Sequence, residues 1–411
     1  MRKKHLDFWR ECQELFILVD MMNWIIIQSS DRGSRYGVGA FIRNFTEEMA
    51  KRIGIFVYVL KLDSDNQLYF KSEKIQNITY LTVPRLIGKK IIDTKTNHVK
   101  RAKNIVRVIS EQISKQEKNV IHMNFAFEYF IGEELAKALN GVTIFTQHIT
   151  LFDDIESDKF NIEKEVCRMV DSIVSVTNNG KDHLLQKFVS SEKLLTIHNG
   201  INLDLFNNSN NHEDIRVKFG LKKELDLVLY SGRLDSGKGL CYLLEAFKLL
   251  IKERPNCHLV MAGDGDFKNI IELTRPISSH VSYLGFIPFS DLLALYYEST
   301  IGVIPSLKEE CSYVALEMLH SGLPVVANSV GGLKEIFTHN NDALLVEATT
   351  DANFSHYKIP NVKQMAEYMK YLLANNKVCT QFSQNAKNRA LSEFTADRMI
   401  DKYLKMVEKL I

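Results

Sequence analysis

The stretch IGVIPSLKEECSYVALEMLHSGLPVVANSVGG, residues 301–332, decides the fold. It begins with an apolar run over 301–306, continues with an amphipathic run over 313–321, and returns to an apolar run over 324–329. Short apolar runs bounded by turn residues predict buried strands, and the longer periodic run between them predicts a helix. The order strand, helix, strand predicts two parallel strands that are joined by a crossover helix.

The same alternation extends in both directions along almost the whole chain. Further strands are predicted over 24–30, 55–60, 78–83, 119–125, 142–148, 172–177, 194–199, 225–232, 257–265, 281–286 and 343–347. Further helices are predicted over 41–53, 99–116, 128–139, 161–171, 239–253, 291–298, 332–338, 363–374, 380–394 and 396–411. Strands that alternate with helices predict a parallel sheet with helices on both faces, the doubly wound α/β class.

A polar, Asn-rich segment, NNSNNHED at 207–214, interrupts the alternation and is the best candidate for a linker. We therefore expect an N-terminal Rossmann-like domain over 1–206, with an extra helical extension at 1–20, and a C-terminal Rossmann-like domain over 207–395. The helix 396–411 is expected to cross back to the first domain. In two facing domains of this class, the default ligand site is the cleft at the carboxyl ends of the strands.

Composition excludes several classes of protein. The chain has 411 residues, of which 45% are hydrophobic, so it can bury a core and is not disordered. Lys and Arg number 52 against 50 Asp and Glu, a formal net charge of +2, which excludes a globally basic nucleic-acid binder. Six cysteines without a CxxC pair, no secretory leader pattern and no apolar run of membrane-spanning length predict a cytoplasmic protein with reduced thiols.

Two stretches that follow predicted strands carry charged groups. In SGRLDSGKG (231–239), Arg233 and Lys238 stand in a glycine-bearing turn at the start of a helix. In EECSYVALE (309–317), Glu309 precedes a helix start and Glu317 lies inside that helix. Cations and backbone N–H groups at a helix start suit a diphosphate, and flanking carboxylates suit sugar hydroxyls. The alternative interpretation is a solvated loop for the first stretch and simple helix capping for the second.

Two features of the first half also follow strands. Gly37 and Gly39 open a helix, and His148 ends the strand 142–148. The third glycine of a dinucleotide fingerprint is missing, because Ile42 stands there, which argues against an NAD site. Close approach of a ligand to the glycine backbone remains open. A lone histidine is commonly structural, so His148 has that alternative.

Together these residues resemble the retaining glycosyltransferase family 4, whose two Rossmann-like domains form the GT-B fold. The resemblance covers about residues 24–411 and is densest in the second half. It rests on HNGINLDLF (198–206), SGRLDSGKG (231–239), MAGDGD (261–266) and the Glu309–Glu317 block with the following SGLPVVANSVGG (321–332). Cys311 and Ser312 depart from the family pattern after the first glutamate, and the insert ATTDANFSHYK (348–358) is not part of that pattern.

The resemblance implies a role for each matching residue. Arg233 and Lys238 would bind the donor diphosphate, Glu309 would contact the donor sugar, and Glu317 would hold the ribose. His148 would lie beside the donor sugar. The remaining donor contacts would come from Gly37, Gly39, Gly232, Gly263, Phe286, Ile287, Ser312, Tyr313 and Val314.

The resemblance further implies transfer of a sugar from a nucleotide sugar, with a UDP-sugar expected, to an acceptor hydroxyl with retention of anomeric configuration. No cofactor and no metal would be needed, since cationic side chains replace a metal. The expected role is synthesis of a bacterial cell-surface glycan or glycoconjugate, with a glycan, lipid-linked or protein or peptide acceptor. The alternatives are a nucleotide-sugar epimerase or another GT-B enzyme, and a donor-binding partner subunit without activity.

The near-zero net charge conceals one basic segment. Residues 84–107 carry eight Lys and Arg residues against Asp93 alone, a net charge of +7, with apolar residues interleaved. Such a segment could dock on an anionic membrane surface or bind a phosphorylated or lipid-linked acceptor. It could equally be a solvated loop and helix face. The sequence therefore allows peripheral attachment at the inner face of a membrane.

Overall fold

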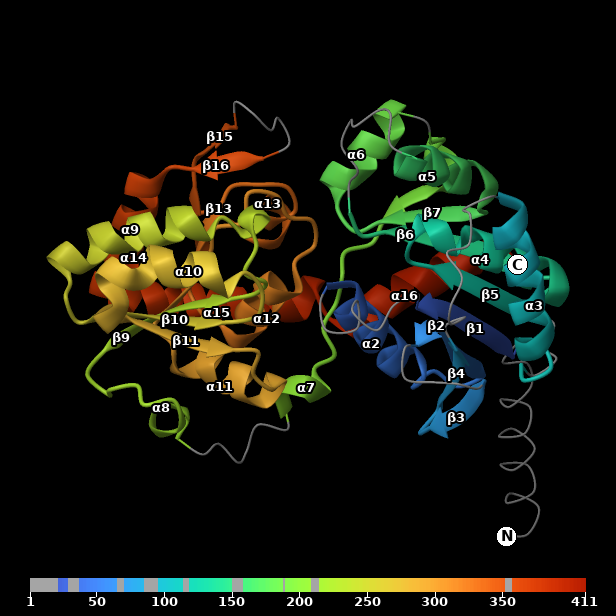
Figure 1. Cartoon of the computed structure of the whole chain (residues 1–411), viewed down its shortest axis with the longest axis horizontal. Coiled ribbons are helices and arrows are strands. Elements are labelled where there is room, and N and C mark those ends of the chain that lie inside the picture. Colours follow the sequence, from blue (N-terminus) through green and yellow to red (C-terminus); the bar gives the residue numbers. More distant parts are fainter. Residues whose placement is uncertain are drawn as a thin grey trace, which may run out of the picture. The chain divides into compact units, whose positions relative to one another are not determined.

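The computed structural model describes residues 21–28, 37–64, 70–84, 95–113, 118–149, 158–187, 189–207, 214–351 and 357–411. The chain forms two compact units (Figure 1). The first comprises Met1–Ser175, Leu184–Ile197 and Ile400–Ile411, and the second comprises Val176–His183 and His198–Met399. The predicted extension at 1–20 and most of the predicted linker, residues 208–213, lie outside the described residues.

The first unit is built on a sheet whose described strands have the order β3-β4-β2-β1-β5-β6-β7-β8. Neighbouring strands are parallel except β3 and β4, which pair antiparallel. The strands are β1 (Met22–Gln28), β2 (Ile55–Ser64), β3 (Lys71–Ile75), β4 (Ile78–Pro84), β5 (Lys118–Met123), β6 (Val142–Gln147), β7 (Ser172–Ser175) and β8 (Leu194–Thr196). The helices are α2 (Gly37–Met49), α3 (Lys95–Ile109), α4 (Tyr129–Leu139), α5 (Asp158–Met169) and the end of α6 (Asn178–Lys187), whose residues up to His183 belong to the second unit. Strand order reverses between β1 and β5, which makes this pair the switch point of the sheet.

The end of the C-terminal helix α16 (Ala396–Val407) belongs to the core of the first unit. Tyr403 is fully buried, and its hydroxyl lies 2.8 Å from Thr146 Oγ1. That threonine oxygen lies 2.7 Å from Nε2 of His122, and Trp24 Nε1 donates to the other ring nitrogen of His122 over 3.3 Å. Since the indole is only a donor, His122 accepts at Nδ1 and donates from Nε2. A buried chain of polar groups therefore joins α16 to β1, β5 and β6.

The second unit contains a parallel sheet in the order β11-β10-β9-β12-β13-β14. Its strands are β9 (Asp226–Ser231), β10 (Cys257–Ala262), β11 (Val281–Gly285), β12 (Ile301–Ile304), β13 (Val325–Asn328) and β14 (Ala343–Val346). Every residue of β12 and β13 is buried, as expected for strands covered by helices on both faces. The helices are α7 (Asp204–Asn207), α8 (Ile215–Lys218), α9 (Leu240–Glu253), α10 (Phe267–Thr274), α11 (Phe289–Glu298), α12 (Tyr313–Ser321), α13 (Leu333–Ile336), α14 (Val362–Ala374) and α15 (Asn376–Glu393). Strand order reverses between β9 and β12.

The structure places the main segment of the second unit from His198 and not from residue 207, and it adds Val176–His183 to that unit. Asn199 Nδ2 donates to the carbonyl oxygen of Cys311 over 2.9 Å. The backbone of Gly200 packs so closely on that of Thr395 that a Cβ atom would overlap it. Because these partners lie more than a hundred positions away in sequence, local composition carries no signal of them.

The insert at 348–358 begins and ends in a small antiparallel pair that the sequence pattern does not predict, β15 (Ala348–Thr350) and β16 (Lys358–Pro360). Residues 352–356 between them lie outside the described residues. Strand β3 and helix α10 are likewise absent from the sequence prediction. Among the described helices, none has the length and apolar character that crossing a membrane requires.

Candidate functional site

The second unit brings Lys238 and Glu309 together at its switch point. Strands β9 and β12 are neighbours, with Val228 opposite Ile301. Lys238 ends the short 3₁₀ turn Ser236–Lys238 that follows β9, and Glu309 lies in the loop that follows β12. Lys238 Nζ lies 2.5 Å from Glu309 Oε2, and both side chains are mostly buried. Two residues 71 positions apart thus form an ion pair where an open parallel sheet binds its ligand.

Close backbone packing fixes the loops around this ion pair. Gly239 has a φ of +66°, and a Cβ atom there would overlap the carbonyl oxygen of Pro305, in the loop after β12. Gly263 has a φ of +151°, and a Cβ atom there would overlap the carbonyl oxygen of Gly232. The N–H of Gly232 donates to Ala262 over 3.0 Å. Glycine is therefore required at 239 and 263, both by conformation and by space.

Two more glycines, Gly331 and Gly332, pack against the backbone of the loop that carries Glu309. Gly332 donates its N–H to the carbonyl oxygen of Glu309 over 3.0 Å. A Cβ atom on Gly331 would overlap that same oxygen, and one on Gly332 would overlap the carbonyl oxygen of Glu310. The two glycines of SVGG allow this approach, so they act on the candidate site through Glu309.

Arg233 is brought near the same edge but has a different partner. Its guanidinium lies 3.1 Å from Asp235 Oδ2, and about half of its side chain is exposed. The carbonyl oxygen of Arg233 accepts a hydrogen bond from the buried hydroxyl of Tyr230 over 2.6 Å. The backbone at Arg233 is therefore fixed, while its charged end lies at the surface beside Asp235, which sequence reasoning did not single out.

Helix α12 starts at the residues that the sequence predicts. Ser312 is its N-cap residue, and its hydroxyl accepts from the N–H of Ala315 over 3.4 Å. Tyr313 and Val314 form the first turn, where backbone N–H groups point out of the helix and favour an anion. Because Glu309 precedes this turn, the helix start faces the same loop as the ion pair.

Glu317 is oriented by a tyrosine that sequence reasoning missed. The hydroxyl of Tyr296 donates to Glu317 Oε2 over 2.8 Å and lies 3.3 Å from Ser231 Oγ at the end of β9. Burial, together with the neighbouring carboxylate of Glu317, raises the pKa of Tyr296 well above its ordinary value. Tyr296 therefore stays protonated and acts as a hydrogen-bond donor to Glu317.

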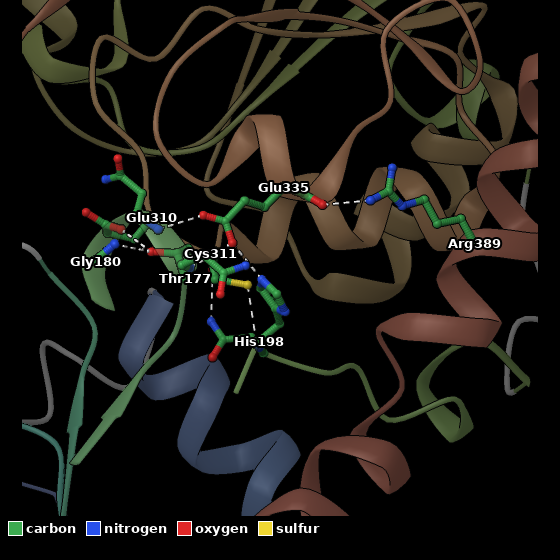
Figure 2. A network of polar contacts seen from close by, with 10 residues as sticks. Thr177, Gly180, His198, Glu310, Cys311, Glu335 and Arg389 are labelled. Atoms are coloured by element: carbon green, nitrogen blue, oxygen red, sulfur yellow. Dashed lines mark hydrogen bonds and ion pairs between the residues drawn. The ribbon is translucent and has the colours of Figure 1, made fainter. Parts of the chain in front are cut away.

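A polar network holds the start of α6 and the chain after β8 against helix α13 (Figure 2). Glu335 accepts from the backbone N–H groups of Asn178 and Asn179 and from Nε2 of His198, at 2.8–2.9 Å. Burial alone would raise the pKa of Glu335, but the hydrogen bonds from His198 and from the two N–H groups outweigh it, and the pKa is lowered. The carboxylate is therefore charged at neutral pH and caps the start of α6.

The same network reaches the residues next to Glu309 (Figure 2). Thr177 Oγ1 donates to Glu310 Oε2 over 2.7 Å, and the N–H of Asn199 donates to the sulfur of Cys311 over 3.3 Å. Burial raises the pKa of the Cys311 thiol to about 12, so this cysteine is an unreactive packing group. Sequence reasoning missed Thr177 and Glu335, because only the fold brings them to this loop.

The predicted base-binding loop follows β11. Phe286 is 57% exposed and Ile287 is partly buried. Beside them, Tyr283 donates its hydroxyl to the carbonyl oxygen of Gly263 over 2.8 Å. The loop with Phe286 therefore stands next to Gly263 at the carboxyl edge of the sheet, with an aromatic face open to solvent.

The first unit places His148 after β6, next to its own switch point. Its Nε2 lies 3.0 Å from Asn124 Oδ1, and its ring lies edge-on to Phe41 with centroids 4.6 Å apart. Asn124 Nδ2 donates to the carbonyl oxygen of Ile27, which leaves Oδ1 as the acceptor for an N–H of His148. Burial lowers the pKa of His148 to about 3, so the ring is neutral with Nδ1 as its acceptor.

Gly37 and Gly39 occupy the first turn of α2, after β1. Gly37 is exposed and Gly39 is buried. A Cβ atom on Gly37 would meet nothing within 4 Å. Gly37 therefore has no packing reason to be glycine among the described residues. The same residues contain no group of three or more His, Cys, Asp or Glu side chains placed to hold a metal ion.

Comparison with known proteins assigns the two halves of the chain to known families. Residues 36–205 match the model of Glycosyltransferase Family 4, and residues 211–389 match that of Glycosyl transferases group 1. An uncharacterized glycosyltransferase of Methanocaldococcus jannaschii is 29% identical over 62% of this chain and 71% of its own length. A UDP-Gal:alpha-D-GlcNAc-diphosphoundecaprenol alpha-1,3-galactosyltransferase of Escherichia coli is 22% identical over 77% of this chain and 83% of its own length.

Solved structures agree on the fold. Sucrose-phosphate synthase of Thermosynechococcus elongatus superposes with a TM-score of 0.76 at 20% identity, covering 95% of this chain and 99% of that structure. HepE of Anabaena, solved in complex with UDP, superposes with a TM-score of 0.71 at 17% identity, covering 95% and 100%. With two Rossmann-like units and a family match on each half, the chain is a glycosyltransferase of the GT-B fold.

Proposed function

We propose that this glycosyltransferase moves a sugar from a nucleotide-sugar donor to an acceptor hydroxyl with retention of anomeric configuration. The observation that carries the proposal is the pairing of Lys238 with Glu309 at the β9–β12 switch point. A paired cation and carboxylate suit a ligand that carries a diphosphate next to a sugar. The cation binds the phosphate oxygens and the carboxylate accepts from sugar hydroxyls.

In the proposed reaction, the bond between the anomeric carbon and the diphosphate oxygen breaks, and the acceptor oxygen bonds to the same face of that carbon. The acceptor proton passes to the leaving diphosphate. Lys238, Arg233 and the start of α12 stabilise the charge that develops on the diphosphate, a term that is often the largest in catalysis. Glu317, held by Tyr296, binds the ribose hydroxyls. These cations take the role of a metal ion.

Neutral His148 fits this scheme on the first unit. The neutral ring offers Nδ1 as an acceptor for a sugar hydroxyl. Glycines 37 and 39 leave room for the donor sugar and acceptor to approach the backbone of α2. The loop with Phe286 and Ile287, beside Gly263 and Gly232, takes the base.

A UDP-sugar is the proposed donor, supported by the UDP-bound structure of the fold relative HepE. The proposed acceptor is a glycan, a lipid-linked sugar, or a protein or peptide, in the synthesis of a bacterial cell-surface glycoconjugate. The basic segment 84–107 supports an anionic, lipid-linked acceptor, and the E. coli relative is named for such a substrate. The enzyme would then work in the cytoplasm at the inner face of the membrane. Residues 85–94 of this segment lie outside the described residues.

A panel of nucleotide sugars read by thermal unfolding tests the donor, because a ligand that binds only the folded state raises its stability. We expect UDP-sugars to raise the midpoint more than ADP- or GDP-sugars do. Acceptor screening by nucleotide release follows, with the anomeric configuration of the product read by NMR. An inverted product would contradict the proposed stereochemistry, and no stabilisation by any nucleotide sugar would contradict the proposed donor class.

Two other functions predict different results in the same experiment. An epimerase releases or interconverts the nucleotide sugar without any acceptor, so acceptor-independent turnover would favour it. A donor-binding partner subunit binds the nucleotide sugar but turns none over. The ion pair of Lys238 and Glu309 favours the transferase, since a subunit that only binds needs no carboxylate at the donor sugar.

A further inference from the structure

The described ends of the insert between β14 and α14, which the family pattern does not contain, pair as a hairpin beside the donor loops. Strands β15 and β16 pair from Ala348 with Pro360 to Thr350 with Lys358. The N–H of Asp351 donates to the carbonyl oxygen of Tyr357 over 2.9 Å and closes the described end of the hairpin. Figure 1 shows it as a separate two-stranded ribbon, apart from the six-stranded sheet of the second unit.

Main-chain hydrogen bonds connect this hairpin to both loops of the ion pair. The N–H of Lys358 donates to the carbonyl oxygen of Leu307 over 2.9 Å, and the N–H of Leu307 donates to the carbonyl oxygen of Gly237 over 2.9 Å. Gly237 is the residue before Lys238, and Leu307 lies two residues before Glu309. Consecutive main-chain hydrogen bonds therefore connect the hairpin to the loop after β12, and that loop to the loop after β9.

Asn328, at the end of β13, forms hydrogen bonds with the backbone of the hairpin and of the loop after β12. Its side chain is completely buried. Its Nδ2 donates to the carbonyl oxygen of Ser306 over 2.9 Å and to that of Lys358 over 2.8 Å. One amide group thus holds the hairpin and the Glu309 loop at a fixed separation.

Tyr357 supports the Lys238 loop from the side of the hairpin. A Cβ atom on Gly237 would lie 3.4 Å from the Tyr357 hydroxyl, which is van der Waals contact distance. The Tyr357 hydroxyl therefore lies close to the residue that precedes Lys238. Gly237 and Gly239 flank Lys238, and a turn with two glycines has high conformational freedom unless neighbouring groups restrict it.

We propose that the β15–β16 hairpin is a brace for the donor site, with Asn328 and Tyr357 as positioning residues that fix Lys238 relative to Glu309. The inference rests on the proposed function and specifies a part of the site that the family pattern lacks. Neither residue needs to touch the donor. A misplacement of about 1 Å at a reacting group can reduce a rate about 100-fold, so a brace two residues away affects both donor affinity and turnover.

Excision of the hairpin is the most direct test. The N–H of Asn361 donates to the carbonyl oxygen of Glu347 over 2.9 Å, so the two ends of the insert are adjacent. Residues 348–360 can therefore be replaced by an Asn-Gly turn. We expect the dissociation constant of UDP, measured by calorimetry, to rise at least tenfold. Thr349→Ala, which removes an exposed side chain and keeps the hairpin backbone, should bind UDP like the wild type.

Point variants keep the test decisive if the excised protein does not fold. Tyr357→Ala should weaken UDP binding about tenfold, whereas Tyr357→Phe, which keeps the ring and removes only the hydroxyl, should weaken it less. Asn328→Ala should weaken UDP binding at least as much as Tyr357→Ala. UDP affinities equal to the wild type in the alanine variants, or in a folded excision variant, would overturn the brace.

A double-mutant cycle separates positioning from general stability. In a Lys238→Ala background, Tyr357→Ala should weaken UDP binding by less than twofold, because the hairpin acts through Lys238. An undiminished tenfold effect in that background would overturn the proposed route. Wild-type protein that binds none of UDP, ADP and GDP would instead refute the proposed function, whereas failure of the brace alone leaves wild-type binding intact.

Discussion

The carboxyl edges of the two sheets are equivalent in topology, and the described residues that bear the predicted site differ between them. At the β9–β12 edge, Lys238 and Glu309 are charged and paired, and their loops are interlocked through glycines and main-chain hydrogen bonds. At the β1–β5 edge, His148 is neutral and is held by the side chain of Asn124 and the ring of Phe41. The same switch-point geometry thus presents a lysine–glutamate ion pair in one unit and an uncharged histidine in the other. We call the first the charged edge and the second, after its histidine, the neutral edge.

This difference matches the two halves of a transfer reaction. In the proposed reaction the leaving group is a nucleoside diphosphate whichever sugar is transferred, so the loops that hold its cations can be fixed by the backbone. Under that proposal, the second unit binds the donor and the choice of acceptor falls to the first unit. Variants at each edge test this difference.

The largest effect is expected at the charged edge. Lys238→Ala and Glu309→Ala should each reduce the transfer rate about 100-fold or more, because each removes a group that acts where charge develops. Initial rates of nucleotide release with saturating acceptor measure this effect. Lys252→Ala, at the other end of α9 and exposed, is the matched control. Rates near the wild type in both site variants would refute the assigned roles.

The second expected effect is a loss of stability when a side chain is added at Gly263, whose backbone packs on Gly232 next to the charged edge. Gly263→Ala should lower the free energy of unfolding by at least about 3 kcal/mol, because the new Cβ atom overlaps the carbonyl oxygen of Gly232 in a backbone conformation that favours glycine. Gly220→Ala also has a positive φ but open space around it, so it should cost only about 1–2 kcal/mol. Urea titrations of both variants give the comparison. Equal losses would show that backbone strain, not the close approach, makes glycine necessary at 263.

Much of the fold follows from the sequence, because strands β9 to β14 are short apolar runs whose burial is local in origin. The predicted helix 313–321 agrees with α12 at both ends, since Ser312 caps it and Gly322 ends it with a φ of +71°. Strand β3 was missed because all of its residues are exposed and it lacks an apolar face. Hairpin β15–β16 was missed because it has no apolar run. Hydrogen bonds from Lys358 to Leu307 and from Asn328 to Lys358 hold it in place instead.

The candidate site divides in the same way. Lys238, Glu309 and the α12 start were predicted because each directly follows a strand, and parallel strands end at one edge. Tyr296, Thr177 and Glu335 were missed because each acts through a side-chain contact with a residue more than 20 positions away. Such partners depend on tertiary packing, and a single sequence contains no period or motif that marks them.

The third expected effect is a pH dependence of the free energy of unfolding that arises from the two buried histidines of the neutral edge. Burial lowers the pKa of His148 to about 3. Burial also lowers the pKa of His122 well below its ordinary value, with a further contribution from repulsion between the two rings when both are protonated. Above pH 6.5 both residues are neutral in the folded and unfolded chain and do not affect stability. Below pH 6.5 the unfolded chain takes up protons that the folded chain excludes. The free energy of unfolding should therefore fall with decreasing pH, by up to about 1.4 kcal/mol per pH unit for each histidine.

Urea titrations between pH 7.5 and 5 measure this slope. His122→Gln and His148→Gln should each make the slope shallower, because each removes one proton acceptor from the unfolded chain. A slope that is unchanged in both variants would mean that acid sensitivity arises outside the neutral edge.

The smallest effect on stability, Gly37→Ala, tests whether the neutral edge is shaped for a ligand. Gly37 is the exposed first residue of α2, and a side chain there meets nothing within 4 Å. Alanine should therefore raise the free energy of unfolding by about 0.5 kcal/mol, since it restricts the unfolded chain. The transfer rate should nevertheless fall several-fold, because the methyl group occupies space that the donor sugar or acceptor needs. A more stable variant with an unchanged rate would place Gly37 outside the reaction and leave Gly39 as the glycine that could contact the ligand.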